Sequence, residues 1–194
     1  MKNLWKMIIV FTCSGFLSLA FAVESNKSFA QTAAKRPPME IATFAAGCFW
    51  GTEEFFRKMP GVVETRVGYT GGALSNPKYE DTHGSKSGHA ESVEIKFDPS
   101  KVSYKHLLDQ FFKMHDPTSL NRQGNDQGSE YRSAIFYHGE KQKKDAMEFK
   151  AKVEKSGAWK APIVTEISEA KTFWEAEPYH QKYIHAGRGT YDNH

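Results

Sequence analysis

Residues 41–61 read "IATFAAGCFWGTEEFFRKMPG", and this stretch decides the fold. The apolar residues 41–46 predict a β-strand, and the residues that follow predict a helix over about 50–58. A Pro-Gly pair then ends the helix. Cys48 therefore lies where a strand passes into a helix, flanked by two glycines and two large aromatic residues.

The segments after this stretch predict an α+β fold. Strands are expected at 62–70, 91–98, 133–138 and 163–168, and helices at 103–115 and 140–157. The first six elements follow the order βαββαβ of a ferredoxin-like core, in which helices cover one face of an antiparallel sheet. Long polar loops join the elements of this two-layer sandwich. Residues 173–187 are expected to form an irregular C-terminal extension, partly helical and broken at Pro178.

The first 22 residues have the composition of a secretory signal peptide. Two lysines precede an apolar run over 7–20, and "AFA" at 20–22 matches a small-x-small cleavage site. The run is short for a membrane span, so we expect cleavage and export to the periplasm, with an uncleaved membrane anchor as the alternative. The polar residues 23–39 would form a flexible leader, and residues 40–194 the folded domain.

The charge balance argues against a nucleic-acid partner. The chain has a net charge of +3, and residues 1–22 hold two lysines and no acid, which leaves +1 after cleavage. Of the two cysteines, Cys13 belongs to the signal region. Cys48 would then be the one thiol of the exported chain, with no internal disulfide.

Cys48 has two interpretations. The first turn of a helix presents free N–H groups and a positive dipole end, which would lower the pKa of the thiol from about 8.5 toward 7 and make it a nucleophile. Phe49 and Trp50 would then supply an apolar wall beside it. Alternatively, all three are core residues, because free cysteine is among the most buried residue types.

Glu91 begins the apolar-periodic strand 91–98 directly after a polar loop. Partial removal from water would raise the pKa of its carboxyl group and let it act as a general acid near neutral pH. The alternative is an ordinary solvated strand end.

The polar loops also hold two phenols and an acid. Tyr79 in "SNPKYED" and Tyr131 in "GNDQGSEYRS" either donate to an oxygen that develops negative charge or are structural. Asp126 lies between glycine turns and either orients its loop or forms an Asx turn. The histidines match no standard ligand spacing, so no metal is expected. The papain-type signature of a Cys-His hydrolase is absent.

Six motifs together resemble the methionine sulfoxide reductase A family. They are "GCFWG" (47–51), "GYTGG" (68–72), "NPKYED" (76–81), "GHAESVEIKFDP" (88–99), "HDPTSLNRQGNDQGSEYRSAI" (115–135) and "YHQKYIH" (179–185). The resemblance implies an α+β catalytic domain with no metal or organic cofactor. It also implies reduction of the S epimer of methionine sulfoxide, free or in oxidised proteins. We expect a monomer.

The resemblance implies a role for each matching residue. Cys48 corresponds to the nucleophile that attacks the sulfoxide sulfur and becomes a sulfenic acid. Glu91 corresponds to the acid that protonates the sulfoxide oxygen. Phe49 and Trp50 correspond to the pocket for the methyl group of the substrate.

The remaining roles belong to the polar loops and to the end of the sequence. Tyr79 and Tyr131 correspond to the phenols that hydrogen-bond the sulfoxide oxygen, and Asp126 to the loop aspartate beside them. "AGRGTYDNH" (186–194) departs from the family because it lacks a resolving cysteine. An external thiol is therefore expected to reduce the sulfenic acid: a thioredoxin-like or glutaredoxin-like protein, or a small thiol.

Two other functions stay open at this point. A one-cysteine thiol peroxidase would also form a Cys48 sulfenic acid but needs no apolar methyl pocket. A secreted binding module would recognise oxidised or thioether side chains through Phe49 and Trp50, without oxidation of Cys48.

Overall fold

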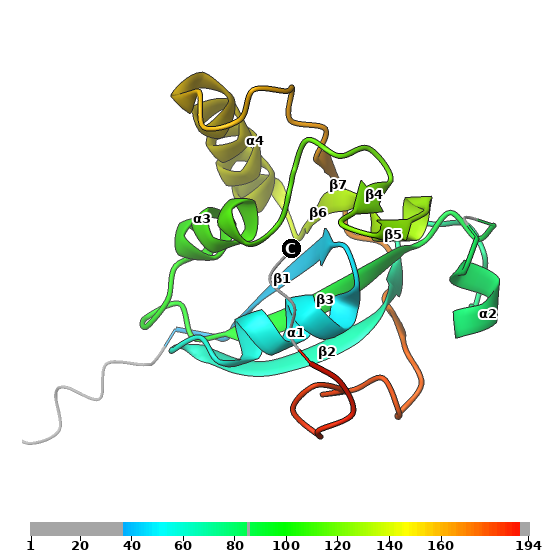
Figure 1. Cartoon of the computed structure of the whole chain (residues 1–194). Coiled ribbons are helices and arrows are strands. Elements are labelled where there is room, and N and C mark those ends of the chain that lie inside the picture. Colours follow the sequence, from blue (N-terminus) through cyan, green and yellow to red (C-terminus); the bar gives the residue numbers. More distant parts are fainter. Residues whose placement is uncertain (1–36, 85, 191–194) are drawn as a thin grey trace, which may run out of the picture. The chain divides into compact units, whose positions relative to one another are not determined.

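The computed structural model of the chain describes residues 37–84 and 86–190 (Figure 1). The predicted signal peptide and most of the predicted leader lie outside these residues. The elements are β1 (Glu40–Ala46), α1 (Phe49–Arg57), β2 (Val62–Thr70), α2 (Tyr79–Thr82), β3 (Ala90–Phe97), α3 (Tyr104–Met114), β4 (Arg122–Gln123), β5 (Asp126–Gln127), η1 (Ser129–Tyr131), β6 (Ser133–Tyr137), α4 (Glu140–Ser156), β7 (Glu166–Glu169) and β8 (Trp174–Glu175).

A single mixed sheet organises the domain, with its strands in the order β7-β6-β1-β3-β2-β8. Neighbouring strands are antiparallel except β6 and β7, which are parallel. The six core elements occur in the predicted sequence, and α2, the β4–β5 ribbon and η1 lie within the predicted polar loops. The α+β class is confirmed, and the more specific ferredoxin-like assignment stays a prediction.

One face of the sheet carries the main core, because alternate strand residues point to it. Phe44 of β1 is fully buried there, with its ring centroid 5.6 Å from that of Phe56 in α1 and 5.0 Å from that of Phe111 in α3. Helix α4 joins the same layer through Phe149, whose ring stacks on that of Phe112 at 5.9 Å. Burial of each such side chain contributes about 1.5–3 kcal/mol. Helix α1 thereby packs against β1 and β3, α3 packs against β1, and α4 packs against α3, β6 and β7 (Figure 1).

Local signals set the ends of the helices where the sequence predicted them. Ser103 caps α3, and its Oγ accepts the backbone N–H of His106 at 3.2 Å. Gly157 ends α4 in the left-handed region at a φ of +70°, as a C-terminal glycine does.

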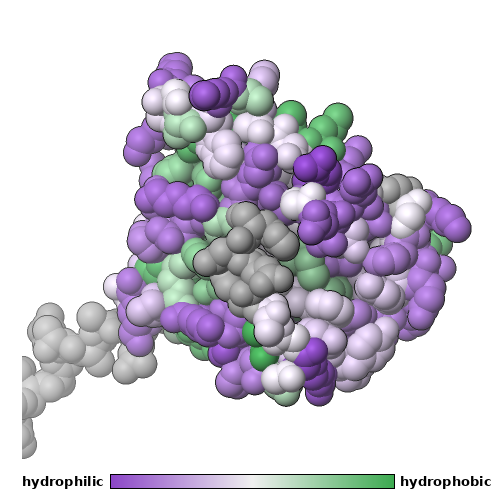
Figure 2. Space-filling view, viewed as in Figure 1, coloured by the Kyte–Doolittle hydropathy of each residue, from purple (hydrophilic) through white to green (hydrophobic). Residues whose placement is uncertain are grey.

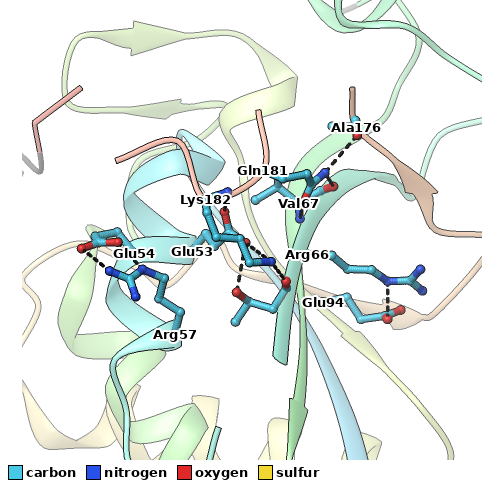
Figure 3. A network of polar contacts seen from close by, with 10 residues as sticks. Glu53, Glu54, Arg57, Arg66, Val67, Glu94, Ala176, Gln181 and Lys182 are labelled. Atoms are coloured by element: carbon cyan, nitrogen blue, oxygen red, sulfur yellow. Dashed lines mark hydrogen bonds and ion pairs between the residues drawn. The ribbon is translucent and has the colours of Figure 1, made fainter. Parts of the chain in front are cut away.

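The C-terminal extension, predicted over residues 173–187, is irregular as expected, but its expected helical part is absent. Strand β8 pairs with β2, and residues 178–187 form a series of turns. Its side chains bond to other elements instead of supporting a helix of their own. Gln181 accepts the N–H of Val67 at 2.9 Å through Oε1 and donates to the carbonyl of Val67 at 2.9 Å (Figure 3).

The surface is mostly polar on the face shown in Figure 2, where hydrophobic residues form only scattered patches. In the described part of the chain, no helix is both long and apolar enough to span a bilayer.

Candidate active site

Cys48 lies between β1 and α1, where a glycine makes the turn. Gly47 has a φ of +88°, and a Cβ atom there would come within 2.7 Å of the Gln123 side chain. Both the backbone conformation and the space therefore require glycine. Cys48 is the N-cap residue of α1 and is half-buried.

The first turn of α1 directs its N–H groups to two side chains. The N–H of Phe49 donates to Oε2 of Glu91 at 3.1 Å. The N–H groups of Trp50 and Gly51 face the Cys48 sulfur and favour its anionic form. The N–H groups in the first turn of a helix have no partner within the helix itself. Those of α1 bond to Glu91 and face Cys48, so the thiol and the carboxyl group meet at the N-terminus of α1.

Glu91 is the second residue of β3 and only 2% exposed, so the solvated alternative is wrong. Burial raises the pKa of its carboxyl to about 8. The Phe49 N–H opposes this rise, and the charges of Asp126 and Glu130 add to it. The predicted rise is confirmed. At pH 7 the carboxyl group therefore keeps its proton.

The predicted fall in the pKa of Cys48 is wrong. Burial, which is the largest effect, and then the charge of Glu91 raise the pKa of the thiol to about 12. The N–H groups of the helix do lower this pKa, as the dipole argument predicted, but burial outweighs them. The resting site thus holds a neutral thiol beside a neutral carboxylic acid, and the sulfur has to lose its proton during the reaction.

The two predicted phenols, Tyr79 and Tyr131, lie close enough to Glu91 and Cys48 for their charges to act on both phenols. Tyr79 begins α2, and its backbone N–H donates to Glu177 at 3.2 Å. Burial, followed by the charges of Glu91 and Cys48, raises the pKa of Tyr79 to about 12. Burial and the Glu91 charge likewise raise the pKa of Tyr131, which is 9% exposed. Both hydroxyl groups therefore remain protonated donors at neutral pH.

A cavity of about 370 Å³ opens beside the sulfur. Cys48, Trp50 and Asp126 line it, with residues from the end of α3 and from the C-terminal segment. Phe49 lies behind this surface, 1% exposed, with its ring centroid 5.8 Å from that of Tyr69. Of the two predicted wall residues, Trp50 therefore meets the cavity, while Phe49 supports it from the core.

Sequence reasoning gave no role to the aromatic partners of Trp50. His180 accepts the indole N–H at 3.0 Å through Nδ1, and Tyr183 stacks on the indole with ring centroids 3.8 Å apart and planes 9° apart. Both residues lie in "YHQKYIH", which contributed only to the resemblance. A buried histidine has no signal in local periodicity, so its role depends on the tertiary fold.

Glu130 was missed as well. It is 1% exposed, and its Oε1 accepts the N–H of Gly84 at 2.9 Å. This bond joins the segment that carries Tyr131 to the one that follows Tyr79. In the described residues, no three histidine, cysteine or acidic side chains are grouped so that they could hold a metal ion.

Residues 40–194 match the family described as peptide methionine sulfoxide reductase. The chain belongs to this family. A peptide methionine sulfoxide reductase MsrA from Methanothermobacter thermautotrophicus is 57% identical over 145 residues, which are 75% of this chain and 86% of the relative. The protein is therefore an oxidoreductase of the family that reduces methionine sulfoxide.

Solved structures of peptide methionine sulfoxide reductases share the fold. Methionine sulfoxide reductase A of Corynebacterium diphtheriae matches with a TM-score of 0.76 and 37% identity, covering 82% of this chain and 80% of the other. Mxr1 from Saccharomyces cerevisiae in complex with Trx2 matches with a TM-score of 0.53 and 28% identity, covering 81% and 91%.

Proposed function

We propose that this peptide methionine sulfoxide reductase reduces the S epimer of methionine sulfoxide, free or within oxidised proteins, and so repairs oxidative damage. The Cys48 sulfur attacks the sulfoxide sulfur, and the sulfoxide oxygen ends on Cys48. One thiol and one sulfoxide become one sulfenic acid and one thioether, so the atoms and electrons balance without a metal or organic cofactor.

The observation that carries the proposal is the buried Glu91 carboxyl group, bonded to the same helix turn that holds Cys48. A sulfoxide oxygen leaves sulfur only as it gains a proton, so a neutral acid is needed beside the thiol. In the proposed step Glu91 gives its proton to that oxygen, and its carboxylate takes the thiol proton as the Cys48 sulfur, whose resting pKa is about 12, bonds to the sulfoxide sulfur. The hydroxyl group then passes to the Cys48 sulfur while the sulfur–sulfur bond breaks, and the electron pair of that bond leaves with the methionine thioether.

The neighbouring side chains support this step. Tyr79 and Tyr131 are protonated donors that can bond the sulfoxide oxygen while its negative charge develops. Asp126 lines the cavity, and its charge adds to the raised pKa of Glu91. Trp50, supported by Phe49, offers an apolar surface for the methyl group.

A separate thiol completes the cycle in this proposal. Cys48 is the one cysteine in residues 23–194 of the printed sequence. A donor thiol condenses with the sulfenic acid to a mixed disulfide and water, and a second thiol then releases Cys48. The complex of the yeast relative with Trx2 favours a thioredoxin-type dithiol protein. A glutaredoxin-like protein or a small thiol would serve in the same way. The protein would act as a monomer.

We also propose that residues 1–22 direct export to the periplasm. Mass spectrometry of the protein in a periplasmic fraction should find a chain that begins at Val23. A membrane-bound chain that keeps residues 1–22 would instead identify an uncleaved anchor.

A single turnover without a donor thiol tests the chemistry. The reduced protein is mixed with either epimer of methionine sulfoxide, and the released methionine and the mass of the Cys48 peptide are measured. We expect about one methionine per chain from the S epimer and none from the R epimer, with one oxygen gained at Cys48 that a sulfenic-acid reagent traps.

The same experiment separates the alternative functions. Oxidation of Cys48 by peroxide but not by the sulfoxide would indicate a thiol peroxidase. Binding of the sulfoxide with Cys48 left as a thiol would indicate a binding module. Equal turnover of both epimers would contradict the proposed stereochemistry.

A further inference from the structure

The methionines of the described residues differ in how far they reach into solvent. They are Met39, Met59, Met114 and Met147. Met39 is 39% exposed and Met147 is 56% exposed, whereas the other two are partly covered. A peroxide in solution oxidises a thioether that it can touch, and the product is the sulfoxide. Among the described methionines, Met39 and Met147 are therefore the first targets of such an oxidant.

Met39 lies in an extended stretch of backbone. It follows the exposed pair Pro37 and Pro38 and precedes β1, outside any helix or strand. Proline removes a backbone donor and holds the residue before it in an extended conformation, which disfavours a helix here. No neighbours at helical spacing therefore crowd the Met39 thioether.

Met147 is presented by a helix instead. It lies in the middle of α4, where Lys143, Lys144 and Lys150 are its neighbours one turn away on the helix surface. Cys48 is half-buried and lines a cavity, so a sulfoxide has to be inserted to reach its sulfur. The body of α4 and these lysine side chains would meet the rim of the cavity before the Met147 sulfur reached the thiol.

Met39 cannot reach the Cys48 thiol of its own chain. The two residues flank opposite ends of β1, which pairs with β3 at Glu40 and with β6 at Ala46. The seven residues of this strand, at about 3.3 Å each, place its ends about 20 Å apart. Both ends are fixed in the sheet, so the strand does not fold back. A second copy of the chain has to supply the thiol.

We propose that Met39, rather than the helical Met147, is a site of reversible oxidation, oxidised by a peroxide and restored by Cys48 of a second copy of the chain. The inference rests on the proposed function, because the repair step is the same sulfoxide reduction.

The cycle balances without any further reactant. The peroxide transfers one oxygen atom to the Met39 sulfur and leaves as water or an alcohol. Cys48 of the second copy takes that oxygen as a sulfenic acid, and a dithiol donor reduces the sulfenic acid to thiol and water. The sum is the reduction of one peroxide by one dithiol. Two copies together thereby consume peroxide without its reaction at Cys48.

The test uses the Cys48→Ser chain, treated with hydrogen peroxide, as a substrate that cannot repair itself. A small amount of reduced, unmodified protein is added with dithiothreitol, and the masses of the Met39 and Met147 peptides are followed. The Met39 sulfoxide should fall to about half, because a peroxide forms both epimers and one enzyme reduces one of them. The Met147 sulfoxide should be reduced at least about tenfold more slowly. A Met39 that peroxide leaves unoxidised, or a sulfoxide that stays unreduced, would overturn the proposal.

Proteolytic digestion of the oxidised Cys48→Ser chain provides the matched control for the backbone argument. The Met147 sulfoxide, once released from α4 in a peptide, should be reduced at least about tenfold faster than in the intact chain. Continued slow reduction would show that the helix is not the obstacle, and would contradict the preference for Met39. Cys48→Ser with dithiothreitol alone serves as the blank.

Two further measurements separate the possible failures. In the unmodified protein, oxidised at Met39, the repair rate per chain after addition of dithiothreitol should rise in proportion to protein concentration. A rate that does not depend on concentration would overturn the step between copies. Free S-epimer methionine sulfoxide is assayed in parallel. If neither substrate is reduced, the proposed function fails. If only the free sulfoxide is reduced, the inference about Met39 alone is overturned.

Discussion

Helices α1 and α3 begin in different ways. The α3 terminus is closed within one turn, where Ser103 Oγ accepts the N–H of His106 at 3.2 Å. The α1 terminus has Cys48 as its N-cap and forms no such bond. Its N–H groups bond instead to Glu91, 42 residues away, and face a sulfur. A local cap stabilises a helix, whereas a cap supplied by another strand places two reactive groups together.

The difference also has an energetic side. Serine is among the preferred N-cap residues, and replacing such a cap costs about 0.5–2 kcal/mol. At α1 the chain forgoes that stabilisation and keeps a thiol. It also buries a carboxyl group whose pKa is raised to about 8. The same helix terminus is therefore a weaker source of stability and the stronger candidate for function.

Cys48→Ser gives α1 a serine N-cap like that of α3, and we expect this substitution to have the largest effect on activity. Methionine release should fall at least about 10³-fold because the nucleophile is lost. The free energy of unfolding should rise by about 0.5–1 kcal/mol, because serine caps helices well. Single-turnover assays and urea titration measure the two changes. Retained activity would contradict the role of Cys48 as the nucleophile. A lower free energy of unfolding would contradict the idea that cysteine is the weaker N-cap.

Glu91→Gln keeps an acceptor for the Phe49 N–H but removes the proton donor. The rate of methionine formation should fall about 10²–10⁴-fold while α1 stays intact. Stopped-flow measurements of single turnover, with circular dichroism to check the fold, provide the test. An unchanged rate would exclude Glu91 as the acid.

The pH dependence of stability tests whether the α1 terminus buries a neutral carboxyl group, which the α3 terminus does not do. Between the ordinary pKa of 4.5 and the folded value of about 8, the unfolded chain loses the Glu91 proton and the folded chain keeps it. The unfolding free energy of the unmodified protein should therefore fall by up to about 1.4 kcal/mol per pH unit over this range. Urea titrations at several pH values should show a smaller slope for Glu91→Gln. Equal slopes would mean that Glu91 is not buried in its neutral form.

The pH profile of kcat/KM should fall as Glu91 ionises. Above a pH of about 8, the value set by the carboxyl pKa, the decrease should approach tenfold per unit. The residual activity of Glu91→Gln should lack this decrease. If a free thiolate were the attacking species, the rate would instead rise with pH toward the Cys48 pKa of about 12, which would overturn the proposed proton transfer.

Ser103→Ala should have the smallest effect and leaves the site alone. Loss of the α3 cap should lower the free energy of unfolding by about 1 kcal/mol. Activity should not change, because α3 begins far from Cys48 in the sequence and Ser103 bonds only within its own turn. Reduced activity in a folded variant would show that the two helix termini are coupled.

The sequence was sufficient for those parts of the site that local patterns determine. The position of Cys48 follows from the strand-to-helix pattern of residues 41–61. For Glu91 the sequence left a solvated strand end open, and only the fold shows that the side chain is buried. The thiol pKa could not be predicted, because its largest causes are burial and the Glu91 charge, which only the tertiary fold supplies. His180 and Tyr183 were missed for the same reason, since their segment has turns where helical character was expected.

The attachment of the C-terminal segment has a consequence for biosynthesis. The hydrogen-bond partner of the Trp50 indole, His180, lies 130 residues further along the chain. The partner of the Val67 N–H, Gln181, lies 114 residues further along. During translation α1 and β2 therefore emerge long before the groups that hold them. Contacts of such long sequence separation slow folding, because the intervening loop has to close first. The surroundings of Cys48 are therefore completed only after residues 180–183 have been made, near the end of translation.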